Sequence, residues 1–262
     1  MSAPEPNHDQ RLHGLRYIHS FICQLKPHGR FDQSLQDQLL FLQYLNTLKG
    51  NYTSQLGQDA FAFAMSGFKR DGYFVEVGAH HGEYLSNTLM LERDHGWRGL
   101  LVEPDPTNHG TLSTRASTLV KKAAWNRSGE ILRFKSVADS ALSVVASVAP
   151  GDGHNRDAAR VIDVETQTLD DMLAAANAPS TIDFMSIDVE GAEMQVLAGL
   201  TFSRWNVQAM SIEHNHDTAR IAAYEDLLGK HGLVRVFEVV SDFDCYFARP
   251  ERIAAWRAAN GA

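Results

Sequence analysis

Short apolar runs alternate with amphipathic segments over most of the chain. Strands are predicted at 73–78, 99–103, 119–124, 182–187, 208–213 and 233–239, and helices at 106–116, 168–176, 190–199 and 217–230. Unbroken apolar strands between helices are typical of a parallel sheet that helices cover on both faces, and such sheets bind ligands where their strands end. The last run, 241–248, follows its predecessor too closely for a helical crossover, so we expect an antiparallel hairpin there.

The first fifty residues differ from the rest of the chain. A helix is predicted from Asp32 to about Lys49, because leucines recur there at helical spacing and a glycine follows. We expect those leucines to face the core; they are Leu35, Leu39, Leu42, Leu45 and Leu48. A second helix is expected from about Gly57 to Phe68, and the polar residues 1–31 are expected to form a flexible arm. The predicted division is an N-terminal extension at 1–53 and one α/β domain at 54–262.

Turn-forming residues gather between about Ser136 and Arg160, above all in the stretch 149–155. A long segment of this kind is predicted to be a mobile loop. Two interpretations of it remain open, a lid over an acceptor site and a surface insertion.

Charge and cysteine content exclude several classes of protein. The 262-residue chain has a net charge of -8 and no basic stripe, which argues against nonspecific nucleic-acid binding. Its two cysteines, Cys23 and Cys245, suggest neither a disulfide framework nor a zinc site. A basic leader followed by an apolar core is missing, and so is any run of about eighteen apolar residues. We expect a cytoplasmic protein that binds neither nucleic acid nor membrane.

The stretch Tyr73–Gly82 joins a predicted strand to a glycine turn and reads Glu76-x-Gly78-x-x-x-Gly82. The next strand ends in Glu103, at the separation where a βαβ unit presents a carboxylate to a ribose. A dinucleotide loop needs Gly-x-Gly-x-x-Gly, which no register here supplies. The Glu76 carboxylate would repel a pyrophosphate but attract an ammonium group, which favours S-adenosylmethionine as the ligand. An ordinary strand-to-helix turn is the alternative interpretation.

Two later strands also run into polar side chains. Asp188 follows one of them, and Glu213 and His214 end the next. If these strands are neighbours, the three side chains form either a base for an acceptor hydroxyl or a site for a hard divalent ion such as Mg²⁺. The alternatives are a plain polar loop and, for Asp188, Glu190 and Glu193, stabilisation of a helix start.

In these blocks the sequence resembles the FkbM-type S-adenosylmethionine-dependent methyltransferases. The matching segments are Ser54–Asp59, Phe74–Gly82, Leu85–Leu89, Leu91–Glu92, Gly96–Pro104, Ser186–Glu193 and Ile212–Asn215. The similarity covers about Ser54 to Ala248 and implies a class I methyltransferase fold. This fold is a doubly wound, Rossmann-like and mostly parallel seven-stranded sheet with an antiparallel strand near the C-terminus. The implied reaction is methyl transfer to a hydroxyl of a sugar, a glycan or a polyketide-like small molecule.

The resemblance also implies roles for single residues. The predicted cofactor-binding set is Glu76, Gly78, Ala79, Gly82, Glu103 and Asp188, with Glu76 at the ammonium group and Glu103 at the ribose hydroxyls. Asp188 or His214 is the predicted base, and Asp188, Glu213 and His214 are the predicted ligands if a metal such as Mg²⁺ orients the acceptor. His81 stands where the family more often has an aspartate. Further matches to the family signatures are Ser54, Gln58, Asp59, Ser86, Asn87 and Thr88.

The predicted function is therefore S-adenosylmethionine-dependent O-methylation of a small-molecule or glycan hydroxyl. Two alternatives belong to other classes. A noncatalytic S-adenosylmethionine-binding module would keep the fold without an acceptor site, and a nucleotide-dependent oxidoreductase would share the βαβ layout.

Overall fold

The computed structural model describes residues 33–137, 144–145 and 160–260. The predicted arm at 1–31 and most of the predicted loop at 136–160 lie outside these residues. The helices are α2 (Gln33–Thr47), α3 (Gln58–Met65), α4 (Leu89–His95), α5 (His109–Leu112), α6 (Leu169–Ala175), α7 (Glu193–Leu197), α8 (Thr218–Gly229) and α9 (Pro250–Ala259). The sequence prediction did not include α4 and α9, and it made α5 too long.

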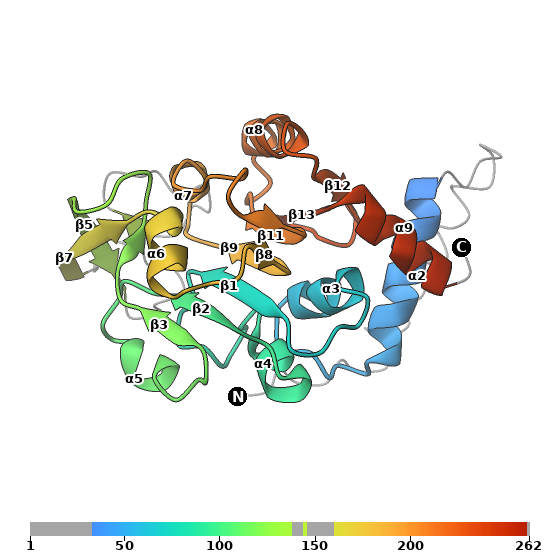
Figure 1. Ribbon diagram of the computed structural model, residues 1–262, viewed down its shortest axis with the longest axis horizontal. Helices are drawn as coiled ribbons and strands as arrows, with labels where there is room; N and C mark the ends of the chain where they lie inside the picture. The colour runs from blue at the N-terminus through green and yellow to red at the C-terminus, as the bar shows by residue number, and fades with distance from the viewer. Residues whose placement is uncertain (1–32, 138–143, 146–159, 261–262) are drawn as a thin grey trace, which may run out of the picture.

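A seven-stranded sheet forms the centre of the molecule, with the strand order β12-β13-β11-β9-β1-β2-β3 (Figure 1). Its strands are β1 (Tyr73–Val77), β2 (Arg98–Val102), β3 (Thr118–Val120), β9 (Phe184–Ile187), β11 (Ala209–Glu213), β12 (Val234–Val236) and β13 (Asp244–Ala248). β13 runs antiparallel to both of its neighbours, and the other pairings are parallel. The predicted fold class and the predicted C-terminal hairpin are confirmed. A short parallel pair, β8 (Thr181–Ile182) and β10 (Asn206–Val207), forms a separate ladder next to this sheet.

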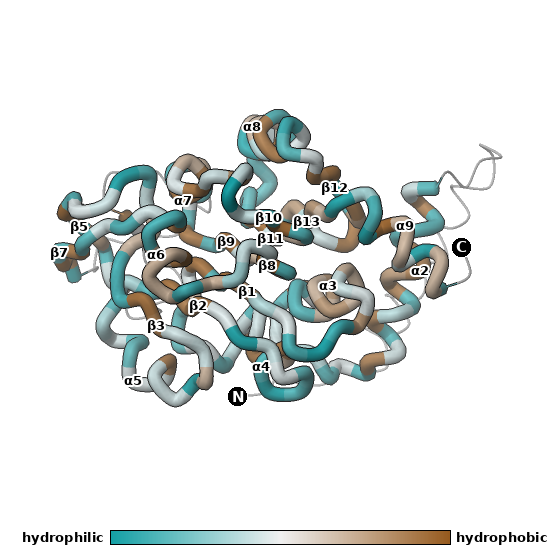
Figure 2. Tube along the Cα trace, in the orientation of Figure 1, coloured by the Kyte–Doolittle hydropathy of each residue, from teal (hydrophilic) through white to brown (hydrophobic). Residues whose placement is uncertain are grey.

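Helices cover both faces of the sheet, as the apolar strands predicted. α6, α7 and α8 contribute to one core, and α2, α3, α4, α5 and α9 contribute to the other. Side chains alternate between the two along β1, since Val75 and Val77 belong to the first core and Phe74 to the second. Full burial of such a side chain contributes about 1.5–3 kcal/mol relative to exposure. Hydrophobic residues accordingly gather in the central strands, and much of the surrounding chain is hydrophilic (Figure 2).

A second, four-stranded sheet lies beside β3 and α6 in the order β4-β7-β5-β6 (Figure 1). Its strands are β4 (Ala123–Ala124), β5 (Ile131–Ser136), β6 (Val144–Val145) and β7 (Arg160–Gln167). The sequence prediction missed this sheet. The predicted strand at 119–124 divides between β3 and β4, and the predicted loop at 136–160 begins and ends in strands. An alternating pattern was the available signal, because every second residue packs inward, at Leu132, Phe134, Ile162 and Val164.

The buried face of α2 matches the predicted leucine stripe only in part, since Leu45 packs against the core. Phe41 is fully buried and stacks on Phe237 with ring centroids 4.4 Å apart, whereas Leu42 is 46% exposed. Asp37 on the same face pairs with Arg257 of α9, and the two helices lie together at one end of the sheet (Figure 1). The predicted boundary between residues 53 and 54 stays a prediction, although α2 shares its core with the domain.

No helix in the described part of the chain has both the length and the hydropathy needed to cross a membrane.

Candidate active site

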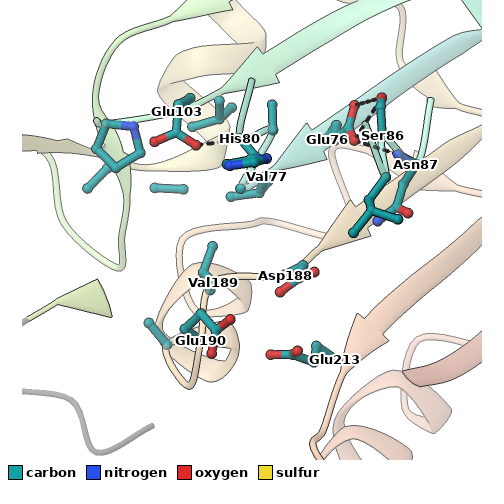
Figure 3. Close-up of a pocket in the computed structure, with 18 of the residues that line it drawn as sticks. Glu76, Val77, His80, Ser86, Asn87, Glu103, Asp188, Val189, Glu190 and Glu213 are labelled. Carbon is teal, nitrogen blue, oxygen red and sulfur yellow. Dashed lines mark hydrogen bonds between the residues drawn. The ribbon is translucent and has the colours of Figure 1, made fainter. Parts of the chain in front are cut away.

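A cavity of about 380 Å³ opens where β1, β2, β9 and β11 end. Six of the predicted site residues line it, namely Glu76, Gly78, Ala79, Glu103, Asp188 and Glu213. Glu103 and His80 lie on one side of the cavity, and the carboxyl groups of Asp188, Glu190 and Glu213 face one another on the opposite side (Figure 3). The parallel strands therefore bring the predicted acidic residues to one edge, as expected for this type of sheet.

Glu76, near the end of β1, anchors the following loop. Its buried carboxylate accepts hydrogen bonds from the backbone N–H of Asn87 at 2.7 Å, from the Ser86 hydroxyl and from the Thr88 hydroxyl. Burial raises the pKa of Glu76, and the nearby Arg115 guanidinium opposes that shift. The sequence alone assigned no role to the signature residues Ser86, Asn87 and Thr88. The structure shows that they hold in place the Glu76 carboxylate, which is predicted to bind the cofactor.

Arg115 braces the same loop from behind. Its buried guanidinium donates to Glu92 at 2.9 Å, to the backbone oxygen of Gly82 at 2.6 Å and to the Thr88 hydroxyl at 3.1 Å. Such charge-assisted bonds fix geometry as well as adding stability. No sequence motif marks Arg115, because its contacts with Glu92 and with the loop after β1 form only in the folded chain.

Gly78 and Gly82 have no room for a side chain, because neighbouring protein atoms occupy the space that a Cβ would take. Gly78 has a φ of 84°, and a Cβ there would lie 1.8 Å from the backbone oxygen of Asp188. Gly82 has a φ of 79°, and its Cβ would meet a Leu112 methyl at 2.6 Å. Gly78 lines the cavity, whereas Gly82 packs against α5, and its predicted contact with the cofactor stays a prediction.

Glu103 follows β2 and carries the second predicted carboxylate. It accepts the backbone N–H groups of His80 at 2.9 Å and Asp105 at 2.7 Å. Burial raises the pKa of Glu103 to about 8, although these two hydrogen bonds oppose the shift. His80 lines the cavity beside it, while His81 stacks on Tyr84. His81, where the sequence departs from the family pattern, is therefore the neighbour of the cavity-lining residue His80.

Asp188, Glu190 and Glu213 form the acidic side of the cavity, and each offers a carboxylate oxygen within 4.8 Å of the others. Burial raises the pKa of Asp188, and Asp244 and Glu193 raise it further. Burial likewise raises the pKa of Glu213, followed by the charge of Asp188. Like charges this close disfavour joint ionisation, so the group tends to hold a proton or a cation.

His214 is not part of this group, which corrects its prediction as base and as metal ligand. The ring is almost fully buried, with Nε2 donating to the backbone oxygen of Asp244 at 3.1 Å and Nδ1 accepting the His216 N–H at 2.9 Å. Burial lowers the pKa of His214, so the ring is neutral near pH 7. Both nitrogens are occupied. Glu190, for which the sequence offered stabilisation of a helix start as an alternative, occupies the third position instead.

The signature segment Ser54–Asp59, which leads into α3, contributes to another wall of the cavity. Asp59 accepts the backbone N–H of Thr53 at 2.7 Å and of Ser54 at 3.3 Å, and the Thr53 hydroxyl donates to the backbone oxygen of Ser86 at 3.0 Å. Gln58 lines the cavity and donates to Asp244 at 2.9 Å. The segment is therefore fastened to both the loop after β1 and the C-terminal hairpin.

Part of the cavity wall is apolar. The residues that form it come from the ends of β2 and β9 and from the second sheet: Val102, Pro104, Ala123, Ala124, Phe134, Val145 and Val189. The second sheet thus contributes directly to the site, which sequence reasoning missed.

A doubly wound sheet of this strand order, with its cavity at the carboxyl ends of the strands, is the fold of the class I methyltransferases. Residues 76–243 match the family model described as the methyltransferase FkbM domain. The chain therefore belongs to the FkbM methyltransferase family, and this family implies S-adenosylmethionine as the methyl donor.

The chain is also similar to a solved structure, the precorrin-6y C5,15-methyltransferase from Geobacter metallireducens GS-15. The sequence identity is 13% and the TM-score 0.38, and the similarity covers 68% of this chain and 70% of that chain. No curated protein matches the chain.

Proposed function

We propose that the protein is an S-adenosylmethionine-dependent O-methyltransferase whose acceptor is a hydroxyl of a small molecule, a sugar or a polyketide-like compound. The observation that carries this proposal is the cavity in which Glu103 faces the carboxyl groups of Asp188 and Glu213. Membership of the family supports the methyl donor. The carboxyl groups support a hydroxyl acceptor because they can take up its proton. The net charge of -8 favours such an acceptor over a nucleic acid.

The residues at one end of the cavity fit the cofactor. Glu103 offers its carboxyl oxygens to the ribose hydroxyls, and the apolar part of the cavity wall suits an adenine ring. The Glu76 carboxylate lines the cavity, and two donor contacts reach each of its oxygens, with the single Ser86 hydroxyl proton shared between them. In our proposal the negative charge of Glu76 attracts the ammonium group. Gly78 and Ala79 line the wall between these two acids.

S-adenosylmethionine, when bound, supplies a methyl group on a positively charged sulfur. The chain must hold the acceptor oxygen in line with that methyl group and exclude water, and such positioning contributes about 7–11 kcal/mol in favourable cases. A general base contributes less, about 10²–10⁴-fold. In our proposal Asp188 accepts the proton of the acceptor hydroxyl, and Glu213 orients the Asp188 carboxyl.

Two measurements test this function. Isothermal titration of the full chain is expected to show binding of S-adenosylmethionine and none of NAD. Incubation with cell extract and methyl-labelled cofactor is then expected to label a small molecule whose new methyl group is on oxygen. Failure to bind S-adenosylmethionine at about 1 mM would overturn the proposal. Binding without methyl transfer to any acceptor would support the noncatalytic module, and labelling on nitrogen or carbon would overturn O-methylation.

The role of Asp188 is tested with Asp188→Asn, which keeps the size of the side chain but removes its basicity. We expect kcat to fall by about 10²–10⁴-fold. Asp226→Asn, at an exposed aspartate on α8, is the matched control and is expected to keep full activity. Unchanged turnover in Asp188→Asn would remove Asp188 as the base.

A further inference from the structure

Three carboxylates from neighbouring segments converge on one point of the cavity. Asp188 follows β9, Glu190 lies in the turn before α7, and Glu213 ends β11. Because β9 and β11 are paired in parallel, their carboxyl ends lie side by side. The three side chains point toward one another with the labelled carboxyl groups facing a common space (Figure 3).

A second observation concerns one oxygen of Glu213. Glu213 is only 7% exposed, and its Oε2 atom is buried without a hydrogen-bond partner. The amide nitrogen of Asn215, another residue of the cavity wall, is buried without a partner as well. A buried carboxylate oxygen without a hydrogen-bond partner is energetically costly, so its presence calls for a group that satisfies it. Exchanging the oxygen and nitrogen of the Asn215 amide would also give the site a neutral oxygen ligand.

A hard divalent cation satisfies both observations. Such cations take oxygen ligands, and oxygens on opposite sides of Mg²⁺ lie about 4.2 Å apart, while those around Ca²⁺ lie about 5 Å apart. The carboxylate oxygens lie within 4.8 Å of one another, which fits this range. The absence of a histidine nitrogen or a thiol from the group favours Mg²⁺ or Mn²⁺ over zinc.

We propose that Asp188, Glu190 and Glu213 bind a divalent cation of the Mg²⁺ class at the acceptor end of the cavity. This set differs from the sequence prediction, because Glu190 takes the place of His214. In the reaction proposed above, on which this part of the inference rests, the cation would hold the acceptor oxygen beside the methyl donor. The positive charge would also ease loss of the hydroxyl proton to water or to a carboxylate oxygen that does not bind the cation.

The test uses the full chain freed of metal with a chelator, and Mn²⁺ as a paramagnetic probe. We expect the electron paramagnetic resonance signal of free Mn²⁺ to fall by one equivalent per chain, and excess Mg²⁺ to restore it. Glu190→Gln and Glu213→Gln are each expected to weaken Mn²⁺ binding at least about tenfold. Glu251→Gln, at an exposed glutamate on α9, is the matched control and is expected to bind Mn²⁺ like the unaltered chain.

Absence of Mn²⁺ binding to the unaltered chain at about 1 mM would overturn the proposal, whatever the folding of the variants. Folded Glu190→Gln and Glu213→Gln variants that bind Mn²⁺ as tightly as the control would overturn it too. The proposed function fails separately. If S-adenosylmethionine binds and Mn²⁺ does not, the cation site is wrong and the cofactor site stands. If Mn²⁺ binds and S-adenosylmethionine does not, the cation site stands and the proposed function is wrong.

Discussion

The backbone oxygen of Asp188 occupies the space that a side chain at Gly78 would need. A Cβ at position 78 would lie 1.8 Å from that oxygen, and φ at this residue is 84°. The loop after β1 and the end of β9 are therefore in direct backbone contact at the floor of the cavity. A change at Gly78 moves a residue of the acidic group as well as the predicted cofactor loop.

We expect Gly78→Ala to destabilise the protein more than its backbone angle alone explains. Gly129 has a nearly equal φ of 82° but open space around it, so Gly129→Ala is the matched control and measures the strain alone, about 1–2 kcal/mol. Gly78→Ala should cost about 1–3 kcal/mol more, because a backbone atom must move. Urea denaturation of the two variants measures this difference. Equal losses would show that the contact with Asp188 relaxes freely.

Arg115→Met is expected to reduce the free energy of unfolding by about 3–5 kcal/mol, because it leaves the Glu92 carboxylate buried without its partner. Arg127→Met, which breaks a pair whose arginine is 78% exposed, is expected to cost no more than about 1 kcal/mol. Chemical denaturation provides both values. A loss of similar size in the two variants would mean that Arg115 does not brace the loop. The folded Arg115→Met variant should also bind S-adenosylmethionine more weakly.

We expect Glu103 to stabilise the folded chain more at low pH than at high pH, because its pKa is raised in the folded state. Its pKa is raised from 4.5 to about 8, so between these values the folded chain keeps a proton that the unfolded chain releases. The contribution of Glu103 to the free energy of unfolding is therefore fully present below pH 4.5 and declines as pH rises toward 8. Glu103→Gln lacks this decline.

The measurement is urea denaturation of Glu103→Gln and the unaltered chain at pH 5 and pH 7. We expect the unaltered chain to lose on the order of 2–3 kcal/mol relative to the variant over this interval. Subtraction removes the contributions of other titrating groups, and also any pH-independent cost of the amide. A difference that stays constant, or that changes in the opposite direction, would show that Glu103 ionises normally in the folded protein.

Asp59→Asn is expected to cost about 1–3 kcal/mol although it preserves the shape of the side chain. Each carboxylate oxygen accepts a backbone N–H, one from Thr53 and the other from Ala60. Either orientation of the new amide therefore sets its NH₂ group against a donor. Asp226→Asn at an exposed i,i+4 pair should change stability by about 0.5 kcal/mol or less. The midpoints of thermal unfolding of the two variants measure this difference. Equal midpoints would contradict the role given to Asp59.

Local pattern was enough to predict the core of this fold. The apolar runs that form β1, β9 and β11 are buried on both faces, and such strands can be predicted without knowing which strands they pair with. The acids that follow them could be placed at one edge for the same reason, since parallel strands share the direction in which they end. Glu76, Glu103, Asp188 and Glu213 were predictable in this way.

Features that depend on distant partners were not predictable. The ring of His214 is an attractive ligand in sequence, but the Asp244 carbonyl and the His216 N–H engage both of its nitrogens. Phe41 rather than Leu42 faces inward because Phe237, almost two hundred residues later, supplies its stacking partner. The antiparallel pairing of β5 with β7 was missed because these strands alternate in polarity over short stretches on either side of a turn-rich segment.

The packing of α2 also bears on the order in which the protein can acquire its structure during synthesis. Phe41 stacks on Phe237, and Asp37 pairs with Arg257. A nascent chain therefore exposes the apolar side of α2 until nearly all of the described chain has left the ribosome, and contacts this far apart in sequence form slowly. We expect α2 to be the part of the chain most dependent on chaperone protection before translation ends.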